Sequence, residues 1–387
     1  MNEFDDIRPY NDDEVKDVLK RLLGNDELIR ALAYFNFPYV SQSRLLGPLI
    51  RYAINCFLAY KFRHIDNVQK FQLLIEPYII KMLKRTTTEV TWSGVDQLSK
   101  DKSYLFLSNH RDIVVDPALV NYGLYKNGYE TLRVAIGDNL LMKSYVSDLM
   151  RLNKSFIVKR SIVNRREKIA ALKTLSAYIS HSVTTGHSVW LAHREGRAKD
   201  GNDLTDSAII KMLQFNYRDE GLQSMLQSLN IVPVSISYEL NPCDAMKAEE
   251  LYVREKTGEY TKAEEEDLDN IISGIQGQKG RVHIAFGSCI SATDIDDAGA
   301  CAKAIDQQIH KNYQLYPINY AACEYLYNSG HEEYAVNHVW KSEISAKQLH
   351  AARLLLEERL SSCKKEAHPW LLKTYANPVK NRLRAIE

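Results

Sequence analysis

A chain of 387 residues is long enough to bury a large hydrophobic core, as one big domain or as two. Its 50 basic and 49 acidic residues nearly balance, so the sequence carries no overall electrostatic attraction for nucleic acid. An anionic ligand would therefore have to be bound by a local cluster of cations. The six cysteines are scattered without CxxC spacing, which is typical of reduced thiols in the cytosol rather than of a disulfide framework or a zinc site.

The N-terminal part of the chain is predicted to be helical. It begins with acidic residues and lacks the apolar stretch of a secretory signal. Two short helices are expected over residues 12–33, followed by helices over 44–63 and 68–83. The 44–63 segment is mostly apolar, but Arg51 interrupts it, so it falls short of the roughly 18 uncharged residues of a membrane span. Two alternatives stay open for it: a helix lying in a membrane interface, or a buried helix covering a sheet.

From residue 89 onward, short apolar runs alternate with helical patterns. Strands are expected over 89–93, 104–108, 133–136, 155–158, 187–192, 231–238 and 281–286. Helices are expected between them over 117–125, 140–152, 165–180 and 206–215. Because such alternation favours parallel pairing, we predict an α/β fold with a mixed, largely parallel sheet covered by helices. Pro233 lacks a backbone N–H, and it favours an edge or an irregular position for its strand.

The remaining segments are helical. Residues 244–278 are highly charged and predict a solvated helical excursion without chemistry. From about 296 the pattern is helical to the end, and Ser345 and Gln348 resemble a capping box that opens a long helix. We therefore predict three regions: an N-terminal helical segment with a candidate membrane-interface helix (1–86), an α/β domain (87–290) and a helical C-terminal region (291–387).

A histidine with acidic neighbours follows the predicted 104–108 strand. His110 is followed by Asp112 and Asp116, after which Pro117 suits the first turn of a helix. A neutral imidazole can take a proton from an alcohol while a carboxylate on its other nitrogen fixes the tautomer. His110 is thus a candidate general base, with Asp116 as the preferred carboxylate and Asp112 as its competitor. Without a nucleophile elbow nearby, direct attack by a substrate hydroxyl is the simpler scheme.

Cations follow two further predicted strands. The candidate phosphate-binding residues are Arg160, Glu195, Gly196, Arg197 and Lys199. Because the carboxyl ends of parallel strands meet at one sheet edge, we expect Arg160, Arg197 and Lys199 to converge there on a phosphate. Gly196 would let the backbone approach the ligand, and Glu195 would orient an arginine or accept a substrate hydroxyl.

Taken together, these blocks resemble the glycerolipid acyltransferase family. That family has an Asn/Ser-His-four residues-Asp block, a strand ending in arginine, a Glu-Gly-x-Arg type block and a strand with Val-Pro, and the same order holds here across residues 103–238. Two departures are visible. Asp116 stands one residue further from His110 than in the family, and residues 196–201 are similar to the Gly-Arg-x-Arg-x-Gly form of glycerol-phosphate acyltransferases.

The resemblance implies an O-acyltransferase of phospholipid biosynthesis. It would move an acyl group from acyl-CoA or acyl-carrier protein to a hydroxyl of glycerol-3-phosphate, 1-acylglycerol-3-phosphate or another lysophospholipid. The partners would be the thioester donor, the acceptor and a membrane surface. Neither a cofactor, a metal nor a nucleic acid is expected. The implied location is cytoplasmic, peripheral on the inner face of the membrane.

Two alternatives within the same fold stay open, namely an acyltransferase with a non-glycerolipid acceptor and a non-catalytic lipid-binding relative. A protein-kinase interpretation of His-Arg-Asp is disfavoured, because Pro117 stands where a kinase needs asparagine and because no Asp-Phe-Gly occurs. Metal binding by His181, His187 and His193 is disfavoured as well, because their spacing suits neither one helix face nor a strand pair.

Overall fold

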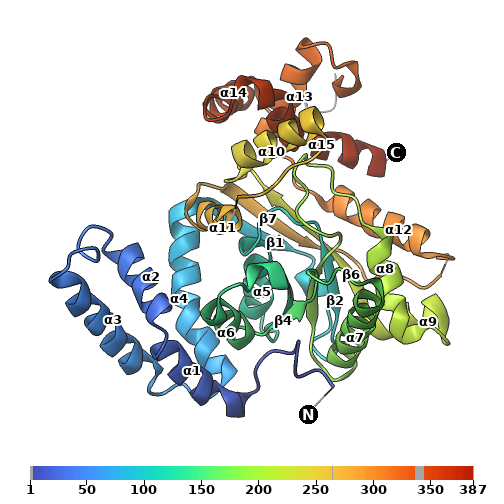
Figure 1. Ribbon diagram of the computed structural model, residues 1–387. Coiled ribbons are helices and arrows are strands. Elements are labelled where there is room, and N and C mark those ends of the chain that lie inside the picture. Colours follow the sequence, from blue (N-terminus) through green and yellow to red (C-terminus); the bar gives the residue numbers. More distant parts are fainter. Residues whose placement is uncertain (1–2, 264, 294, 336–343, 387) are drawn as a thin grey trace. The chain divides into compact units, whose positions relative to one another are not determined.

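A computed structural model describes the chain over residues 3–263, 265–293, 295–335 and 344–386 (Figure 1). Residues 336–343 of the predicted helical C-terminal region and Glu264 of the predicted excursion lie outside the described residues. The chain divides into two compact units. The small unit comprises Met1–Ile80 and Arg133–Ala171, and the large unit comprises Lys81–Leu132 and Leu172–Glu387.

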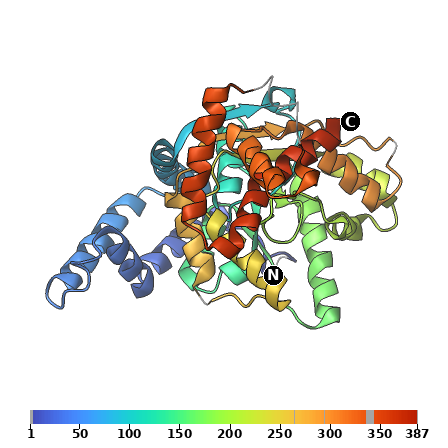
Figure 2. The ribbon, with the colours of Figure 1, turned by 90° about the horizontal axis from the view of Figure 1, so that it is seen from above.

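The small unit is built on N-terminal helices. Its elements are α1 (Val15–Leu23), α2 (Asp26–Asn36), α3 (Leu46–Phe62), β3 (Arg133–Gly137), α6 (Ser144–Leu152) and β4 (Ser155–Val158). One face of α1 is apolar and buried, because Val18 and Leu22 lie in a core with Phe71 and Leu152. β3 and β4 pair in parallel, and α2 and α3 lie side by side (Figures 1 and 2). Helices α4 (Val68–Thr86) and α7 (Arg165–Thr184) run from the small unit into the large one.

The large unit contains the strands next to residues 109–116, which we call the histidine turn because they include His110. They are β1 (Thr87–Ser93), β2 (Leu105–Ser108), β5 (Val189–Ala192), β6 (Ile231–Tyr238) and β7 (Gly280–Phe286). Their order is β1-β7-β6-β2-β5. β1 pairs in parallel with β7, and β2 pairs in parallel with both β5 and β6, whereas β6 and β7 are antiparallel. The predicted α/β fold with a mixed, largely parallel sheet is thus confirmed.

The expectation for Pro233 is wrong, because β6 is an interior strand between β2 and β7. The antiparallel ladder with β7 begins at Val234, one residue after the proline. On that side Pro233 contributes its carbonyl alone, which accepts the N–H of Gly287 at 2.8 Å. The missing N–H therefore falls just before the ladder, where no strand partner requires it.

Helices cover the sheet and extend beyond it. Those of the large unit are α5 (Val115–Lys126), α8 (Ser207–Leu213), α9 (Gly221–Leu229), α10 (Asp244–Thr257), α11 (Glu266–Gln276), α12 (Ala298–Asn312), α13 (Pro317–Asn328), α14 (Ala346–Ser361) and α15 (His368–Ile386). Short 3-10 turns occupy Asp12–Glu14, Val95–Gln97, Asp138–Leu140, Gln214–Tyr217, Glu332–Tyr334 and Lys365–Ala367. The capping box of Ser345 and Gln348 is present at the start of α14, as predicted. Of the helices that the structure describes, none combines the length and apolarity of a bilayer span.

The C-terminal helices form a second hydrophobic core. Residues of α13, α14 and α15 pack together with Ala248 of α10, and Ala321, Leu356 and Leu371 are fully buried among them. Figure 1 shows α10, α13, α14 and α15 grouped above the strands, and in Figure 2, seen from above, they lie in front of the sheet. The predicted helical C-terminal region is therefore a packed body with its own core.

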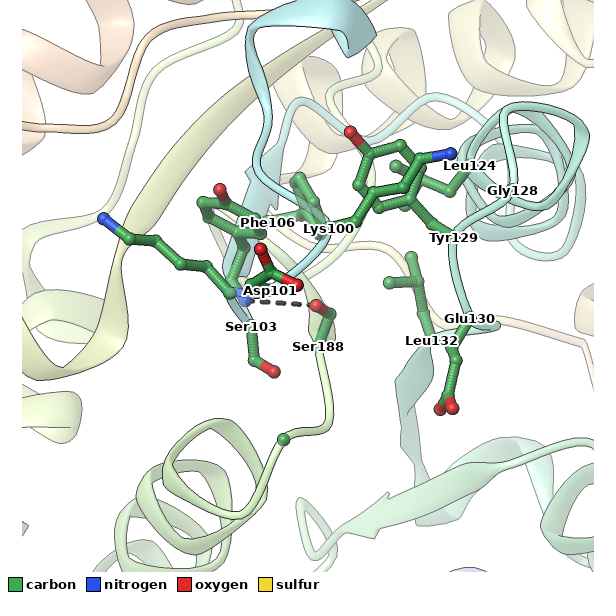
Figure 3. A pocket seen from close by; sticks show the side chains of 13 residues that line it. Lys100, Asp101, Ser103, Phe106, Leu124, Gly128, Tyr129, Glu130, Leu132 and Ser188 are labelled. Carbon is green, nitrogen blue, oxygen red and sulfur yellow. Dashed lines mark hydrogen bonds between the residues drawn. The ribbon is translucent and has the colours of Figure 1, made fainter.

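A pocket of about 230 Å³ lies at the amino ends of β2 and β5. Figure 3 shows Lys100 lying across the ring of Tyr129, with Leu124 and Leu132 on the same side of the pocket. Tyr104 N–H donates to Ser188 Oγ at 3.1 Å in its wall. Its lining includes neither His110 nor Arg197. The pocket therefore lies apart from the histidine turn, which follows the opposite end of β2.

Candidate active site

The histidine turn follows β2, and a buried carboxylate organises it. His110 Nδ1 lies 2.8 Å from Asp116 Oδ2. The same oxygen accepts the backbone N–H of Arg111 at 2.5 Å and of Asp112 at 2.8 Å. Its other oxygen accepts the hydroxyl of Tyr238, the last residue of β6, at 2.7 Å. Asp116 is thus the carboxylate that holds the imidazole.

These donors keep Asp116 ionised although it is fully buried. Burial alone would raise its pKa, but the hydrogen bond and charge of His110, together with the other donors, bring the pKa below its ordinary value. Burial and the neighbouring Asp116 raise the pKa of Tyr238 well above its ordinary value, so its hydroxyl remains a donor. An ionised carboxylate on Nδ1 leaves Nε2 as the ring nitrogen that can accept a proton.

Asp112 has a different environment. Its Oδ1 accepts the backbone N–H of Val114 at 3.0 Å and of Val115 at 2.9 Å, at the start of α5. Burial and the charge of Asp116 raise the pKa of Asp112. On its other side, Asp112 packs so closely on Gly274 of α11 that a Cβ there would lie 2.1 Å from Oδ2. The geometry gives Asp112 the place of a helix cap, and it is Asp116 that bonds to the imidazole.

Neighbouring side chains fix the imidazole and its turn. The His110 ring meets Trp190 edge to face at 5.5 Å, and Trp190 Nε1 donates to Ser108 Oγ at 3.0 Å. Asn109 donates to Ile236 O at 3.0 Å and accepts from Ile236 N at 2.7 Å, which joins the turn to β6. The His110 side chain retains 13% of its exposure, so part of it remains accessible to solvent.

The loop after β5 is fastened to the same turn. Ala198 N–H donates to the carbonyl of His110 at 2.9 Å. Arg197, the preceding residue, is half-buried, and its Nη1 donates to Asn270 of α11 at 2.9 Å. Gly196 has a left-handed backbone (φ 74°), and nothing lies within 4 Å of a Cβ built there, so the space beside its backbone is open. The structure therefore brings Gly196 and Arg197 together with His110.

The other predicted phosphate ligands differ in setting. Lys199 already forms an ion pair with Glu250 of α10. Glu195 is exposed on the loop. Arg160 belongs to the small unit, where its backbone N–H donates to Asp138 Oδ1 at 3.0 Å. The predicted convergence of Arg160 with the residues of the loop stays a prediction, as do the roles of all these side chains.

The expectation that residues 244–278 form a merely solvated excursion is wrong, because several of their polar side chains are buried against the turn and the loop. Lys247 is 1% exposed and donates to the carbonyl of Arg111 at 2.6 Å. Burial, and then the positive charge of Arg197, lower the pKa of Lys247 to about 7. Glu250 and Asn270 are buried as well. A charged helical sequence gives no signal that separates such buried polar residues from solvated ones.

A second group missed by the sequence supports the turn from behind. Arg111 donates to Asp203 at 2.5 Å in a fully buried ion pair. Asn109 donates to the same Asp203 oxygen at 3.2 Å. Among the described residues, no group of three or more His, Cys, Asp and Glu side chains is placed to hold a metal ion. His193, one of the three histidines considered above, is buried and pairs through Nδ1 with Thr205 Oγ1 at 3.2 Å.

The sequence of this region matches that of known proteins. Residues 89–237 match the sequence model of the family described as Acyltransferase. This segment belongs to the acyltransferase family. The family assigned from the motif blocks is thereby confirmed, and it covers His110, Asp116 and Arg197. Helices α10 to α15 lie beyond the matched segment.

Curated relatives extend the match only in part. The glycerol-3-phosphate acyltransferases of Pseudomonas fluorescens strains SBW25 and Pf0-1 are each 25% identical over 206 residues, which is 53% of this chain. The chain spans 23% of the length of these relatives. The crystal structure of the 1-acyl-sn-glycerophosphate (LPA) acyltransferase PlsC from Thermotoga maritima aligns with 76% of this chain and 91% of its own, at 13% identity and a TM-score of 0.36.

The burial of His193 predicts a specific acid sensitivity. Burial lowers its pKa to about 3, whereas an unfolded histidine titrates near 6.5. Between about pH 6.5 and pH 3 the unfolded chain therefore binds the additional proton, so stability is lost as pH falls through this window. Relative to His193→Gln, the free energy of unfolding of the native protein should fall more steeply, by up to about 1.4 kcal/mol per pH unit. Denaturant titrations at several pH values give the free energy of unfolding of both proteins. The same dependence of this free energy on pH in both proteins would contradict the prediction.

Proposed function

We propose that this protein is an O-acyltransferase that moves a fatty acyl group from a thioester to a hydroxyl of a glycerol-phosphate or lysophospholipid acceptor. The observation that carries the proposal is the contact of His110 Nδ1 with the buried Asp116 carboxylate at 2.8 Å, within the acyltransferase segment. The Ala198–His110 backbone bond supports it, because that bond keeps the cationic loop beside the imidazole.

The His110–Asp116 pair can act as a general base in acyl transfer. The acceptor hydroxyl attacks the thioester carbonyl and gives its proton to His110 Nε2, while Asp116 stabilises the resulting imidazolium. The tetrahedral intermediate then collapses, the carbon–sulfur bond breaks, and the leaving thiolate takes the proton from His110. Atoms and charge balance with the acyl donor as co-substrate, either acyl-CoA or acyl-carrier protein, and without a cofactor. A general base of this kind contributes about 10²- to 10⁴-fold in rate.

Arg197 is the first candidate for binding the acceptor phosphate. It is half-buried one residue before the bond that joins the loop to His110, and a guanidinium can hold a phosphate through two parallel donors. The open space at Gly196 would admit the ligand to the backbone. Lys199 could serve as a second cation for the phosphate only by leaving its ion pair with Glu250. Arg160 and Glu195 stay as further predicted contacts.

Peripheral attachment to the inner face of a membrane is the second part of the proposal. Residue Gly47 is the one residue of α3 that is buried, which disfavours the alternative of a buried helix covering a sheet. Large apolar side chains are exposed across α2, α3 and their connection: Tyr34, Phe35, Phe37, Tyr39, Val40, Leu45, Leu46, Leu49, Tyr52, Phe57 and Tyr60. Contiguous exposed apolar surface marks interaction sites, and Arg51 and Lys61 on the same helix suit anionic lipid.

Substitutions of the two aspartates of the turn should differ in their effects, one lowering turnover and the other lowering stability. His110→Ala and Asp116→Asn should each lower kcat by about 10²- to 10⁴-fold, because they remove the base or the charge behind it. Asp112→Ala should leave kcat closer to that of the native protein and lower the free energy of unfolding by about 1 kcal/mol, since it removes the side chain that caps the helix. Steady-state assays with a long-chain acyl thioester and denaturant titrations measure both effects. Full turnover by His110→Ala would refute the mechanism.

Substitution of Arg197 should act on the acceptor. Arg197→Ala should raise the KM for glycerol-3-phosphate or its 1-acyl derivative, with a smaller fall in kcat, because the charge that binds phosphate is lost in ground and transition states alike. The matched control is Arg254→Ala, which removes an arginine that pairs with Glu250 from the exposed side of α10. A KM change confined to the acyl donor would argue against the phosphate role.

Membrane binding should depend on the exposed face of α3. Leu49→Asp combined with Tyr52→Asp should reduce sedimentation with anionic phospholipid vesicles, because 64% and 72% of these residues are exposed and available for insertion. Leu354→Asp on α14 is the control, since it changes a leucine of comparable exposure, 56%, in the C-terminal region. Equal binding by the native protein and the double variant would show that the exposed face of α3 does not bind the membrane.

A further inference from the structure

The C-terminal helix α15 contacts the loop that carries Arg197. Thr374 Oγ1 donates to the carbonyl of Lys199 at 2.7 Å, and Asn377 Nδ2 donates to the carbonyl of Asp200 at 2.8 Å. Thr374 is 3% exposed, and its bond to the loop is part-buried. Two consecutive backbone carbonyls of the loop are therefore bound by side chains of a helix that comes more than 170 residues later in the chain.

The next residue of the loop packs directly on the backbone of α15. Gly201 has a left-handed conformation (φ 78°), and a Cβ at this position would lie 2.3 Å from the carbonyl oxygen of Thr374. That carbonyl would ordinarily accept the N–H of the residue four positions later, but that residue is Pro378, which has none. The proline thus breaks the helical bonding of α15 at the place where the loop meets it.

The other side of the loop is joined to the histidine turn. Besides the bond from Ala198 to the His110 carbonyl at 2.9 Å, Arg111 donates to the carbonyl of Gly201 at 3.4 Å. Residues 197–201 are consequently fixed between the histidine turn and α15. The position of the Arg197 guanidinium depends on both supports.

α15 is itself rigidly held. Tyr375 donates to Asp244 at 2.6 Å and accepts the N–H of Asn241 at 3.1 Å, just after β6. Asn377 also accepts the hydroxyl of Tyr334 at 2.7 Å. Leu371 and Ala376 of the same helix are fully buried in the C-terminal core. The helix can therefore transmit a fixed position to the loop.

We propose that Thr374 and Asn377 are positioning residues that set the acceptor-binding loop, which makes the helical C-terminal region part of the acceptor site. The inference rests on the proposed function, because it takes from that function the ligand, a glycerol phosphate bound by Arg197. It goes beyond that function by assigning a task to a region outside the acyltransferase segment.

The test compares substitutions on one face of α15. Thr374→Val and Asn377→Ala each remove one bond to the loop and should raise the KM for glycerol-3-phosphate by about 2- to 10-fold, the usual effect of losing one neutral hydrogen bond. The KM for the acyl donor should not change. Thr374→Ser keeps the hydroxyl and should restore the native KM. Asn381→Ala is the matched control, because Asn381 lies one turn later, is buried, and has a side-chain nitrogen without a partner in the described structure.

Binding without turnover separates this inference from the proposed function. Calorimetric titration with glycerol-3-phosphate should show the same weakening for Thr374→Val and Asn377→Ala, and native affinity for Thr374→Ser and Asn381→Ala. A native protein that binds glycerol-3-phosphate but transfers no acyl group would refute the proposed reaction and leave this comparison decisive. Absence of binding by the native protein, equal effects of Asn377→Ala and Asn381→Ala, or a parallel rise in both KM values would each overturn the inference.

Discussion

The geometry around His110 depends on one buried negative charge. Asp116 lies in the first turn of α5, and it receives donors from the imidazole, from two backbone N–H groups of the turn and from the hydroxyl that ends β6. An unpaired buried carboxylate would be costly, so these four bonds are a condition for its ionisation and also a constraint on the turn. The same interactions that keep the carboxylate charged fix the direction of the imidazole.

The turn also accommodates a longer spacing between the histidine and its aspartate than the family has. One additional residue separates His110 from Asp116, yet the carboxylate still reaches Nδ1. Asp112 makes this possible by capping the start of α5, and Lys247 holds the Arg111 carbonyl from the other side. The spacing of a motif is therefore less informative than the position of its residues on the elements. Here the helix begins so that its first turn presents Asp116 to the ring.

Much of this could be predicted from local sequence, and the rest could not for definite reasons. The strands of the sheet and the capping box at Ser345 follow from apolar runs and side-chain chemistry that act over a few residues. The place of Pro233 inside the sheet depends on where the ladder with β7 begins, which is a long-range property. The contacts of Lys247 and Thr374 are equally long-range, since each joins residues more than 130 positions apart. No periodicity reports such pairings.

The docking of Gly201 on the Thr374 carbonyl has a consequence for how this chain can be divided. The acyltransferase segment ends at residue 237, well before α15. Expressed alone, that segment would return the carbonyls of Lys199 and Asp200 to water and expose the surface that α10 and α15 cover. In this protein the homologous segment therefore depends on α15 for the contacts that hold residues 199–201. A segment inserted in its place would have to present two carbonyls to Thr374 and Asn377 to keep these contacts.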